Sequence, residues 1–274
     1  MRIKICISAI AISALIGVFF FWKSSFQSAV SVSVQEEKNI IADIQSVQSE
    51  QVVKEKENTP VVTKAPGVIE KKIIQNVPFT SQAPTGNWND PVFQNACEEA
   101  TLLMADKWLQ GREFGTARER EIEIRRMTKE EESYFPKDSY DLSATDILVL
   151  AQKYYPEMRI SLVENVTTDD MKKALSEGSI VIIPTNGRTL RNPNFTAPGP
   201  LYHTLLIRGF DPVTDEFITN DPGTRMGALY RYAADTVFHA MHNNETGHHG
   251  KIFPDEKVML VIRKNPSLGS PTSK

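Results

Sequence analysis

The first strongly patterned segment of the chain is a continuous apolar run, ICISAIAISALIGVFFFW, over residues 5–22. Arg2 and Lys4 precede it and Lys23 follows it. Its 18 residues reach the short end of the length that spans a bilayer as a helix. A signal peptide usually has a shorter apolar core and a small-residue cleavage site, which the following residues match poorly. We therefore predict an uncleaved signal anchor (transmembrane helix) over residues 1–23, with the rest of the chain outside the cytoplasmic membrane.

The next residues, 24–72, are polar and show no sustained hydrophobic periodicity. They are rich in Ser, Gln, Glu, Lys and Val, and no aromatic residue follows Phe26 within them. A segment of this composition buries too little apolar surface to fold alone. We therefore predict a flexible linker over residues 24–72, and a disordered tail over residues 267–274.

The patterning of a folded domain begins at Ile73. Residues 73–266 contain all seven Tyr and two of the three Trp of the chain. A segment of this length can form one hydrophobic core, so we predict a single domain over residues 73–266. At its start we expect a short strand over residues 73–79 and a turn-rich loop over residues 81–93.

Three helices are predicted in the first half of this domain. Asn95 stands where it can cap a helix over about residues 96–110, and Gly111 can end that helix. The apolar residues of this segment recur at helical spacing. Two further helices are predicted from residue pairs with the spacing of a capping box, Ser143 with Asp146 and Thr167 with Asp170.

The second half of the domain has strand character. Four β-branched apolar runs indicate strands, over residues 179–185, 202–210, 216–220 and 257–263. Because the helices come first and most strands come later, we predict an α+β fold rather than alternating βαβ units.

The composition is that of an ordinary globular protein, with 41% hydrophobic and 24% charged residues. The formal net charge of -3 gives no reason to expect nucleic-acid binding. The chain has two cysteines, Cys6 inside the apolar run and Cys97, which excludes a disulfide framework. Cys97 is then either a small buried hydrophobe or a reactive thiol.

Three residues of the domain suggest nucleophilic chemistry. Cys97 lies in the first turn of a predicted helix, where unpaired N–H groups and the helix dipole favour a thiolate. His203 begins a predicted strand and Asp221 follows the next one, so two neighbouring antiparallel strands could bring them together. Plainer interpretations stay open, a core histidine for His203 and a turn residue for Asp221. A slip of one residue would put Asn220 in the place of Asp221.

A set of motifs in this order resembles the peptidase family 39-like group of cysteine peptidases, which are similar to the proteases that trim double-glycine leaders from bacteriocins. The motifs are NVPFTSQ (76–82), Trp88, NACEEATLLMA (95–105), YHTLLIRGFD (202–211) and ITNDPG (218–223). The resemblance implies a papain-like fold with an N-terminal helical part and a C-terminal antiparallel sheet. It covers essentially all of residues 73–263.

The resemblance also implies roles for four residues. Cys97 would be the nucleophile, His203 the general base and Asp221 the residue that orients His203. Gln82 would supply an oxyanion-hole donor, alongside the Cys97 backbone N–H. No cofactor is implied. One departure from many relatives is that Glu98 and Glu99, rather than Gly-Pro, follow the nucleophile; they could raise the pKa of the thiol.

We therefore predict a membrane-anchored thiol peptidase that hydrolyses peptide or amide bonds outside the cytoplasmic membrane. Its partners would be a peptide or protein substrate and, through the N-terminal helix, the membrane. Two alternatives remain open. An acyltransferase would use the same residues with an amine in place of water, and a non-catalytic tethered binding domain would keep only the fold.

Two other segments carry side chains with possible functions. The loop over residues 185–201 is long, rich in Asn, Pro and Gly, and ends just before His203, so it could form a wall of the substrate cleft. Four histidines follow in a polar segment, His239, His242, His248 and His249. They could bind a metal, although a polar loop is the plainer interpretation.

Overall fold

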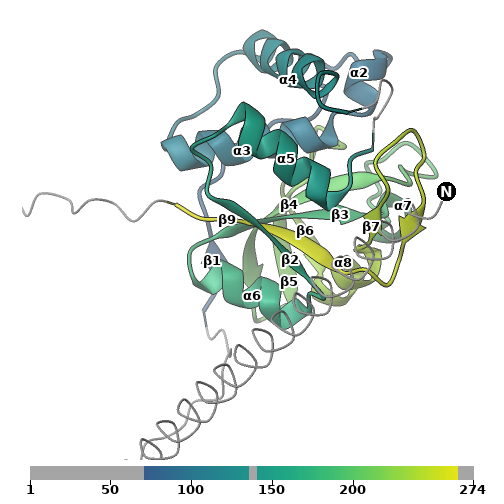
Figure 1. Cartoon of the computed structure of the whole chain (residues 1–274). Coiled ribbons are helices and arrows are strands. Elements are labelled where there is room, and N and C mark those ends of the chain that lie inside the picture. Colours follow the sequence, from purple (N-terminus) through teal and green to yellow (C-terminus); the bar gives the residue numbers. More distant parts are fainter. Residues whose placement is uncertain (1–70, 136–140, 265–274) are drawn as a thin grey trace, which may run out of the picture. The chain divides into compact units, whose positions relative to one another are not determined.

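The computed structural model describes residues 71–135 and 141–264 (Figure 1). The anchor predicted over residues 1–23, nearly all of the predicted linker and the predicted tail over residues 267–274 lie outside the described residues. Among the described residues, no helix is both long enough and apolar enough to cross a membrane.

A seven-stranded antiparallel sheet organises the described residues. Its order is β2-β9-β3-β4-β5-β6, with β1 paired to β4 off that path, while β7 and β8 form a separate pair. The strands are β1 (Ile73–Ile74), β2 (Ile160–Glu164), β3 (Ile180–Thr185), β4 (His203–Asp211), β5 (Glu216–Asn220), β6 (Ala228–Ala233), β7 (Asn243–Asn244), β8 (Ile252–Phe253) and β9 (Val258–Ile262).

Helices cover both faces of this sheet (Figure 1). α3, α4 and α5 form a layer over one face, and α6 and α8 lie on the other. The helices of the described residues are α2 (Pro91–Gln94), α3 (Cys97–Gln110), α4 (Ala117–Glu131), α5 (Ala144–Tyr154), α6 (Thr168–Ser176), α7 (Gly187–Leu190) and α8 (Ala234–Ala240). The α+β fold class predicted from the order of the elements is confirmed.

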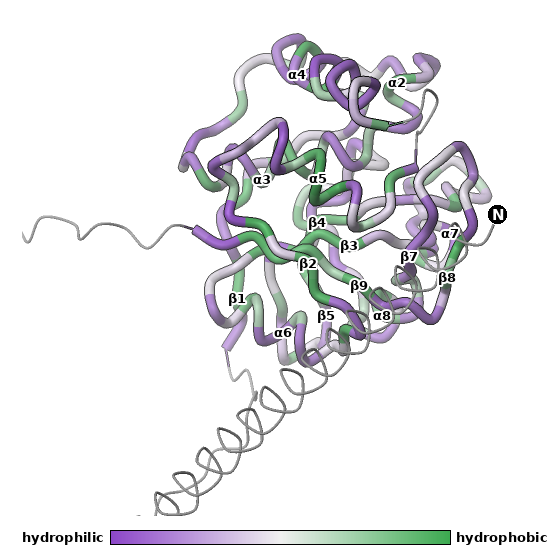
Figure 2. The backbone as a smooth tube through the Cα atoms, viewed as in Figure 1, coloured by the Kyte–Doolittle hydropathy of each residue, from purple (hydrophilic) through white to green (hydrophobic). Residues whose placement is uncertain are grey.

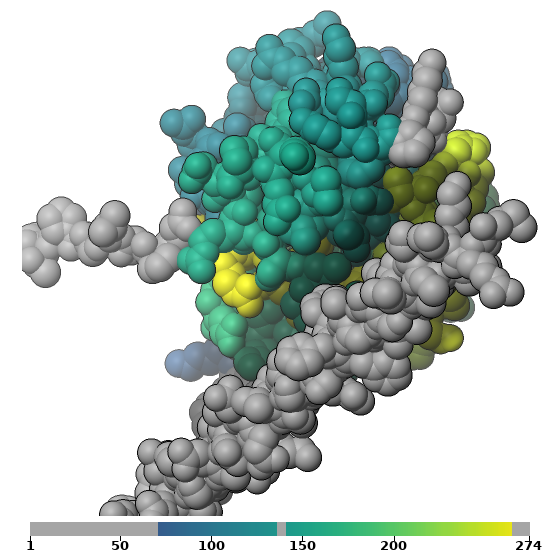
Figure 3. All heavy atoms as spheres, viewed as in Figure 1, coloured from purple at the N-terminus to yellow at the C-terminus, as the bar shows by residue number. Residues whose placement is uncertain are grey.

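The central strands are apolar without alternation because each of their faces is covered. Ile182 of β3 joins a core cluster with Trp108 of α3, whereas its neighbour Val181 joins a second cluster with Val237 of α8. Successive residues of a strand point to opposite faces, so both faces need apolar residues. Figure 2 shows these hydrophobic strands between the helical layers, and Figure 3 shows the α3–α5 layer packed over the sheet.

The predicted start of the first helix is wrong in one respect. α3 begins at Cys97 after Ala96, and Asn95 does not cap it. Asn95 instead closes the short helix α2, donating from Nδ2 to the backbone oxygen of Pro91. Asp90 caps α2 and Pro91 opens it, inside the segment that was predicted to be a loop. The predicted end at Gly111 is confirmed, because that residue has a left-handed backbone with φ of 63°.

The predicted strand over residues 73–79 is confirmed only at its start, where Ile73 and Ile74 pair with β4 as β1. Farther along, the Asn220 side chain donates to the backbone oxygens of Val77 and Pro78. Pro78 has no N–H to offer a ladder, and the two carbonyls have a side-chain partner instead. This segment then leads to Gln82, whose backbone N–H donates to the backbone oxygen of Pro222.

The charged segment AREREIEIRRMTKEE forms a helix, α4, that the hydrophobic pattern did not reveal. Thr116 and Glu119 form a reciprocal capping box at its start. Only four of its side chains are buried, and two of the four are carboxylates. The buried residues are Glu121, Ile124, Met127 and Glu131. The remaining predicted helices and strands are confirmed, including α6 with its Thr167 and Asp170 capping box. The box predicted at the start of α5 is incomplete, because Ser143 accepts from the Asp146 N–H but its own backbone N–H donates to Thr246 Oγ1.

Candidate active site

Cys97 is the first residue of α3 and lies at the junction of that helix with β4. It is a free cysteine and is only 6% exposed. Its sulfur donates to Glu98 Oε2 at 3.0 Å and accepts a hydrogen bond from the Thr204 backbone N–H. The thiol is therefore held between its own helix and the strand that carries His203.

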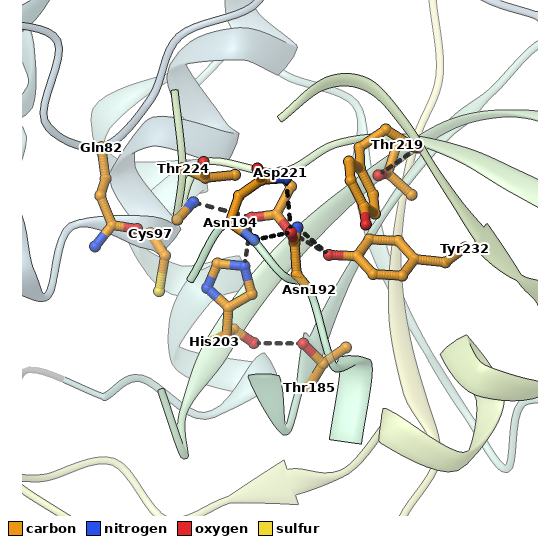
Figure 4. A network of polar contacts seen from close by, with 12 residues as sticks. Gln82, Cys97, Thr185, Asn192, Asn194, His203, Thr219, Asp221, Thr224 and Tyr232 are labelled. Atoms are coloured by element: carbon orange, nitrogen blue, oxygen red, sulfur yellow. Dashed lines mark hydrogen bonds and ion pairs between the residues drawn. The ribbon is translucent and has the colours of Figure 1, made fainter. Parts of the chain in front are cut away.

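His203 opens β4, opposite Thr185 of β3, and is buried. Its Nε2 lies 2.9 Å from Asp221 Oδ1. The other ring nitrogen, Nδ1, lies on the side of the Cys97 sulfur (Figure 4). Thr185 Oγ1 donates to the His203 backbone oxygen, and Phe195 meets the imidazole edge-on with 5.3 Å between ring centroids. These contacts fix the ring with Nε2 toward Asp221 and Nδ1 toward the Cys97 sulfur.

Asp221 is fully buried directly after β5. Besides His203, its carboxylate accepts from Asn192 Nδ2, the Tyr232 hydroxyl and the Gly223 backbone N–H. Burial acts to raise the pKa of Asp221, but the facing His203 and these donors outweigh it, so the pKa lies below its usual value. The carboxylate is thus ionised beside the imidazole.

Asp221 and Asn220 point in different directions. Asn220 turns to the other side of the strand, where it binds Val77 and Pro78 and accepts from Arg208 Nη1. Asp221 alone of the two contacts His203. The register that places Asn220 opposite Leu206 produces this arrangement.

Gly223 is required by close packing around the imidazole. A Cβ at this position would lie 2.9 Å from His203 Cε1 and 2.9 Å from Phe195 Cε1. The two rings also pack edge-on against each other, which limits how far either can move away. The Asp-Pro-Gly sequence therefore serves two purposes, a turn after β5 and room for the His203 ring.

Gln82 lies beside Cys97, but its amide does not have the orientation expected of an oxyanion donor. Its Nε2 donates to the backbone oxygens of Phe93 and Gln94, at 3.0 and 3.1 Å. Its Oε1 is buried and has no hydrogen-bond partner among the described residues. The two carbonyls fix the amide orientation, since only an N–H can satisfy them. The donor role of Gln82 is thus not displayed in this arrangement.

The thiol is not activated by its position on the helix alone. Burial raises the pKa of Cys97 well above its usual value, and the charge and hydrogen bond of Glu98 act in the same direction. The Thr204 N–H opposes this shift without cancelling it. These effects outweigh the stabilisation of a thiolate that was expected from the helix N-terminus. The expectation that Glu98 and Glu99 could raise the pKa of the thiol is correct in direction.

A cleft of about 630 Å³ opens at these residues. Gln82, Cys97 and His203 all line it. The loop over residues 185–201 contributes Asn194, Phe195, Thr196 and Pro200 to its wall, as predicted. Aromatic and polar side chains from other segments complete it, among them Trp88, Asp141, Tyr202 and Arg225.

Three residues of the site were not found from the sequence. Asn192 and Tyr232 reach Asp221 from the loop after α7 and from β6. Glu98 was noted only as an unusual neighbour of Cys97, and its contact with the sulfur depends on side-chain packing. No cluster of three or more His, Cys, Asp or Glu suited to a metal occurs among the described residues, which include the four histidines.

A comparison with protein families agrees with the resemblance seen in the motifs. The family model described as the Peptidase_C39 like family matches residues 74–249, which include Gln82, Cys97, His203 and Asp221. Among solved structures, a Bacillus anthracis protein described as a C39-like peptidase aligns with a TM-score of 0.42 and 14% identity, over 72% of this chain and 99% of that chain. No curated protein matches. The chain belongs to the Peptidase_C39 like family of cysteine peptidase-like proteins.

Proposed function

We propose that this chain is a cysteine peptidase in which Cys97 attacks the substrate carbonyl and His203 transfers the proton. The arrangement of His203 carries this proposal. Its Nε2 is held by an ionised, fully buried carboxylate, and its Nδ1 lies toward the only thiol of the described residues. Such an acid–imidazole–thiol series is the arrangement that nucleophilic catalysis requires.

The reaction would proceed in two steps. In the first, His203 Nδ1 takes the Cys97 proton as Sγ bonds to the carbonyl carbon, and Asp221 stabilises the resulting imidazolium. The imidazolium then protonates the leaving amine as the C–N bond breaks. In the second, His203 deprotonates a water that attacks the thioester, and the C–S bond breaks to release the carboxylic acid.

Two groups would stabilise the oxyanion. The Cys97 backbone N–H belongs to the first residue of α3 and so lacks an intrahelical acceptor. Gln82 would supply the second donor by turning one N–H from the Phe93 or Gln94 oxygen toward the substrate oxygen. Its neighbourhood to Cys97 in the cleft supports this role.

We also propose that the peptidase domain is tethered outside the cytoplasmic membrane. The support for this proposal is the uncharged run over residues 5–22 and its flanking positive residues. The open cleft supports a peptide or protein segment as substrate, because an extended chain can lie along it.

The proposal is tested by alkylating the full-length chain with iodoacetamide at neutral pH and following modification of the Cys97 peptide by mass spectrometry. A general base typically contributes at least about 100-fold. We expect His203→Ala to slow modification of Cys97 by about that factor. Equal rates in the two proteins would mean that the thiol is not paired with the imidazole, and the peptidase proposal would be abandoned.

A further inference from the structure

Glu98 touches the atom that the proposed reaction uses. It is the second residue of α3, a position where an acidic side chain usually points to solvent, yet it is only 4% exposed. Its Oε2 lies 3.0 Å from Cys97 Sγ. The carboxyl group therefore fills the space on the helix side of the sulfur.

Thr204 determines which oxygen of Glu98 can carry a proton. The Thr204 hydroxyl donates to Glu98 Oε1 at 3.2 Å, so that oxygen acts as an acceptor. A proton on the carboxyl group is then left for Oε2, the oxygen that faces the sulfur. The same Thr204 donates its backbone N–H to the sulfur. When Glu98 is protonated, the hydrogen bond that the thiol otherwise donates to Oε2 is reversed, and Glu98 Oε2 and the Thr204 N–H then both donate to Sγ.

The surroundings of Glu98 favour its protonated form. Glu99 of the same helix, Glu131 of α4 and Asp141 before α5 all present carboxyl groups to this region, while β4 contributes the neutral Thr204 and α3 the Cys97 thiol. Burial first, and then the charge of Glu99, raise the pKa of Glu98 to about 8. Near neutral pH the group is therefore mostly a carboxylic acid.

We propose that Glu98 is a further catalytic residue, which in its acid form donates a hydrogen bond from Oε2 to the Cys97 sulfur. This inference rests on the proposed peptidase function. During attack, the thiol proton passes to His203 Nδ1 and the O–H of Glu98 stabilises the negative sulfur. When the thioester is cleaved, the sulfur leaves with the electron pair of the C–S bond and meets the same donor. Glu98 keeps its proton throughout.

The ionised form of Glu98 opposes the reaction. An ionised Glu98 accepts a hydrogen bond from the Cys97 S–H at 3.0 Å and repels a thiolate. It therefore keeps Cys97 in the unreactive thiol form. The reactivity of Cys97 should therefore fall as pH rises through the pKa of Glu98, about 8. An ordinary thiol behaves oppositely, because its thiolate fraction grows with pH.

The test is the rate of iodoacetamide modification of Cys97 in the full-length chain between about pH 6 and 10, measured by mass spectrometry. In the wild type we expect the part of the rate that His203→Ala abolishes to be roughly tenfold lower at about pH 9 than at pH 7, following the fraction of protonated Glu98. Glu98→Gln keeps the shape of the side chain, and Thr204 should orient its amide with Nε2 toward the sulfur. We expect this variant to lose the alkaline fall and to react roughly tenfold faster than the wild type at pH 9.

Glu99→Gln is the matched control. Glu99 is an equally buried neighbour on α3, but it contacts Thr128 and Glu131 rather than the sulfur. We expect this variant to keep an alkaline fall. A His203-dependent rate that rises steadily through pH 8 to 9 would overturn the proposal, as would superimposable profiles for wild type and Glu98→Gln. The loss of dependence on His203 would instead overturn the peptidase function itself.

Discussion

Two buried carboxyl groups flank the Cys97–His203 pair, and they are in opposite states. Asp221 on the histidine side is fully buried and has a lowered pKa. Glu98 on the cysteine side is almost as buried and has a pKa raised to about 8. Burial alone would raise both, so the difference comes from their hydrogen-bond partners and neighbouring charges.

The partners of the two groups explain this difference. Asp221 accepts from Asn192, Tyr232 and the Gly223 N–H in addition to His203. Glu98 has one hydroxyl donor, Thr204, and lies among further carboxyl groups. The result suits an imidazolium on one side and a negative sulfur on the other. In the proposed reaction, a charge lies beside the group that would become positive, and a neutral acid lies beside the group that would become negative.

The largest effect is expected from removing the charge of Asp221. In Asp221→Asn, the new amide N–H groups would face the donors Asn192 and Tyr232, and the imidazolium would lose its counter-ion. We expect the rate of Cys97 alkylation or substrate hydrolysis to fall by about 100-fold or more. Asn220→Asp serves as the comparison, because it places a carboxyl group one residue earlier on a side chain that points away from His203. A loss of less than about threefold in Asp221→Asn would mean that the carboxylate does not support the imidazolium.

The next largest effect is the pH dependence that Glu98 gives to the free energy of unfolding. Burial and the charge of Glu99 raise the pKa of Glu98 to about 8 from its ordinary value of 4.5. The folded chain therefore keeps a proton that the unfolded chain loses, and the free energy of unfolding falls as pH rises from 4.5 to about 8. The contribution is at most about 1.4 kcal/mol per pH unit for this group.

We expect Glu98→Gln to reduce the drop in the midpoint of thermal unfolding between pH 5 and pH 8, compared with the wild type. Glu131, whose pKa is raised to about 11 by burial and by Glu99, should give a similar result when changed to Gln. An unchanged pH dependence in both variants would show that these carboxyl groups are ionised in the folded protein.

A smaller effect is expected from Tyr232→Phe, which removes one donor from Asp221. A hydrogen bond to a charged group contributes about 1.5 kcal/mol or more, so we expect roughly a tenfold lower rate. The pKa of Asp221 should rise, which would move the acid limb of the pH–rate profile to higher pH. Tyr230→Phe, on the neighbouring ring of β6, is the control. Identical acid limbs in wild type and Tyr232→Phe would contradict the role of this hydroxyl.

The smallest effect is expected at Thr204, the donor to Glu98 Oε1. Thr204→Val removes the hydroxyl and keeps the backbone N–H that reaches the sulfur. The loss of a donor to the carboxylate should raise the pKa of Glu98 further, so the alkaline fall in Cys97 reactivity should shift upward by less than about one pH unit. Thr204→Ser should leave it in place. A shift to lower pH in Thr204→Val would contradict this assignment.

The sequence predicted the parts of the molecule that depend on local patterns. The runs at 179–185, 202–210, 216–220 and 257–263 became strands because central strands are covered on both faces and must be apolar throughout. Helix α4 was missed for the opposite reason. Most of its residues are charged, and half of its buried side chains are glutamates.

The candidate site divides in the same way. The motifs around Cys97, His203 and Asp221 pointed to the residues that meet in the structure, because strand order and register bring the start of β4 beside the end of β5. Asn192 and Tyr232 could not be found, since they lie 29 and 11 residues from Asp221 and are ordinary residues of a loop and a strand. The orientations of Gln82 and Glu98 depend on packing that no spacing reveals.

The most direct test of the central claim is acylation of the full-length chain by p-nitrophenyl acetate near neutral pH, with mass spectrometry of the Cys97 peptide. We predict an initial burst of p-nitrophenolate, an acetyl thioester on Cys97, and continued turnover as water releases it. His203→Ala should show neither burst nor turnover at this residue. A folded wild-type chain in which Cys97 stays unacetylated, or is acetylated equally with and without His203, would contradict the claim that these residues form a nucleophilic active site.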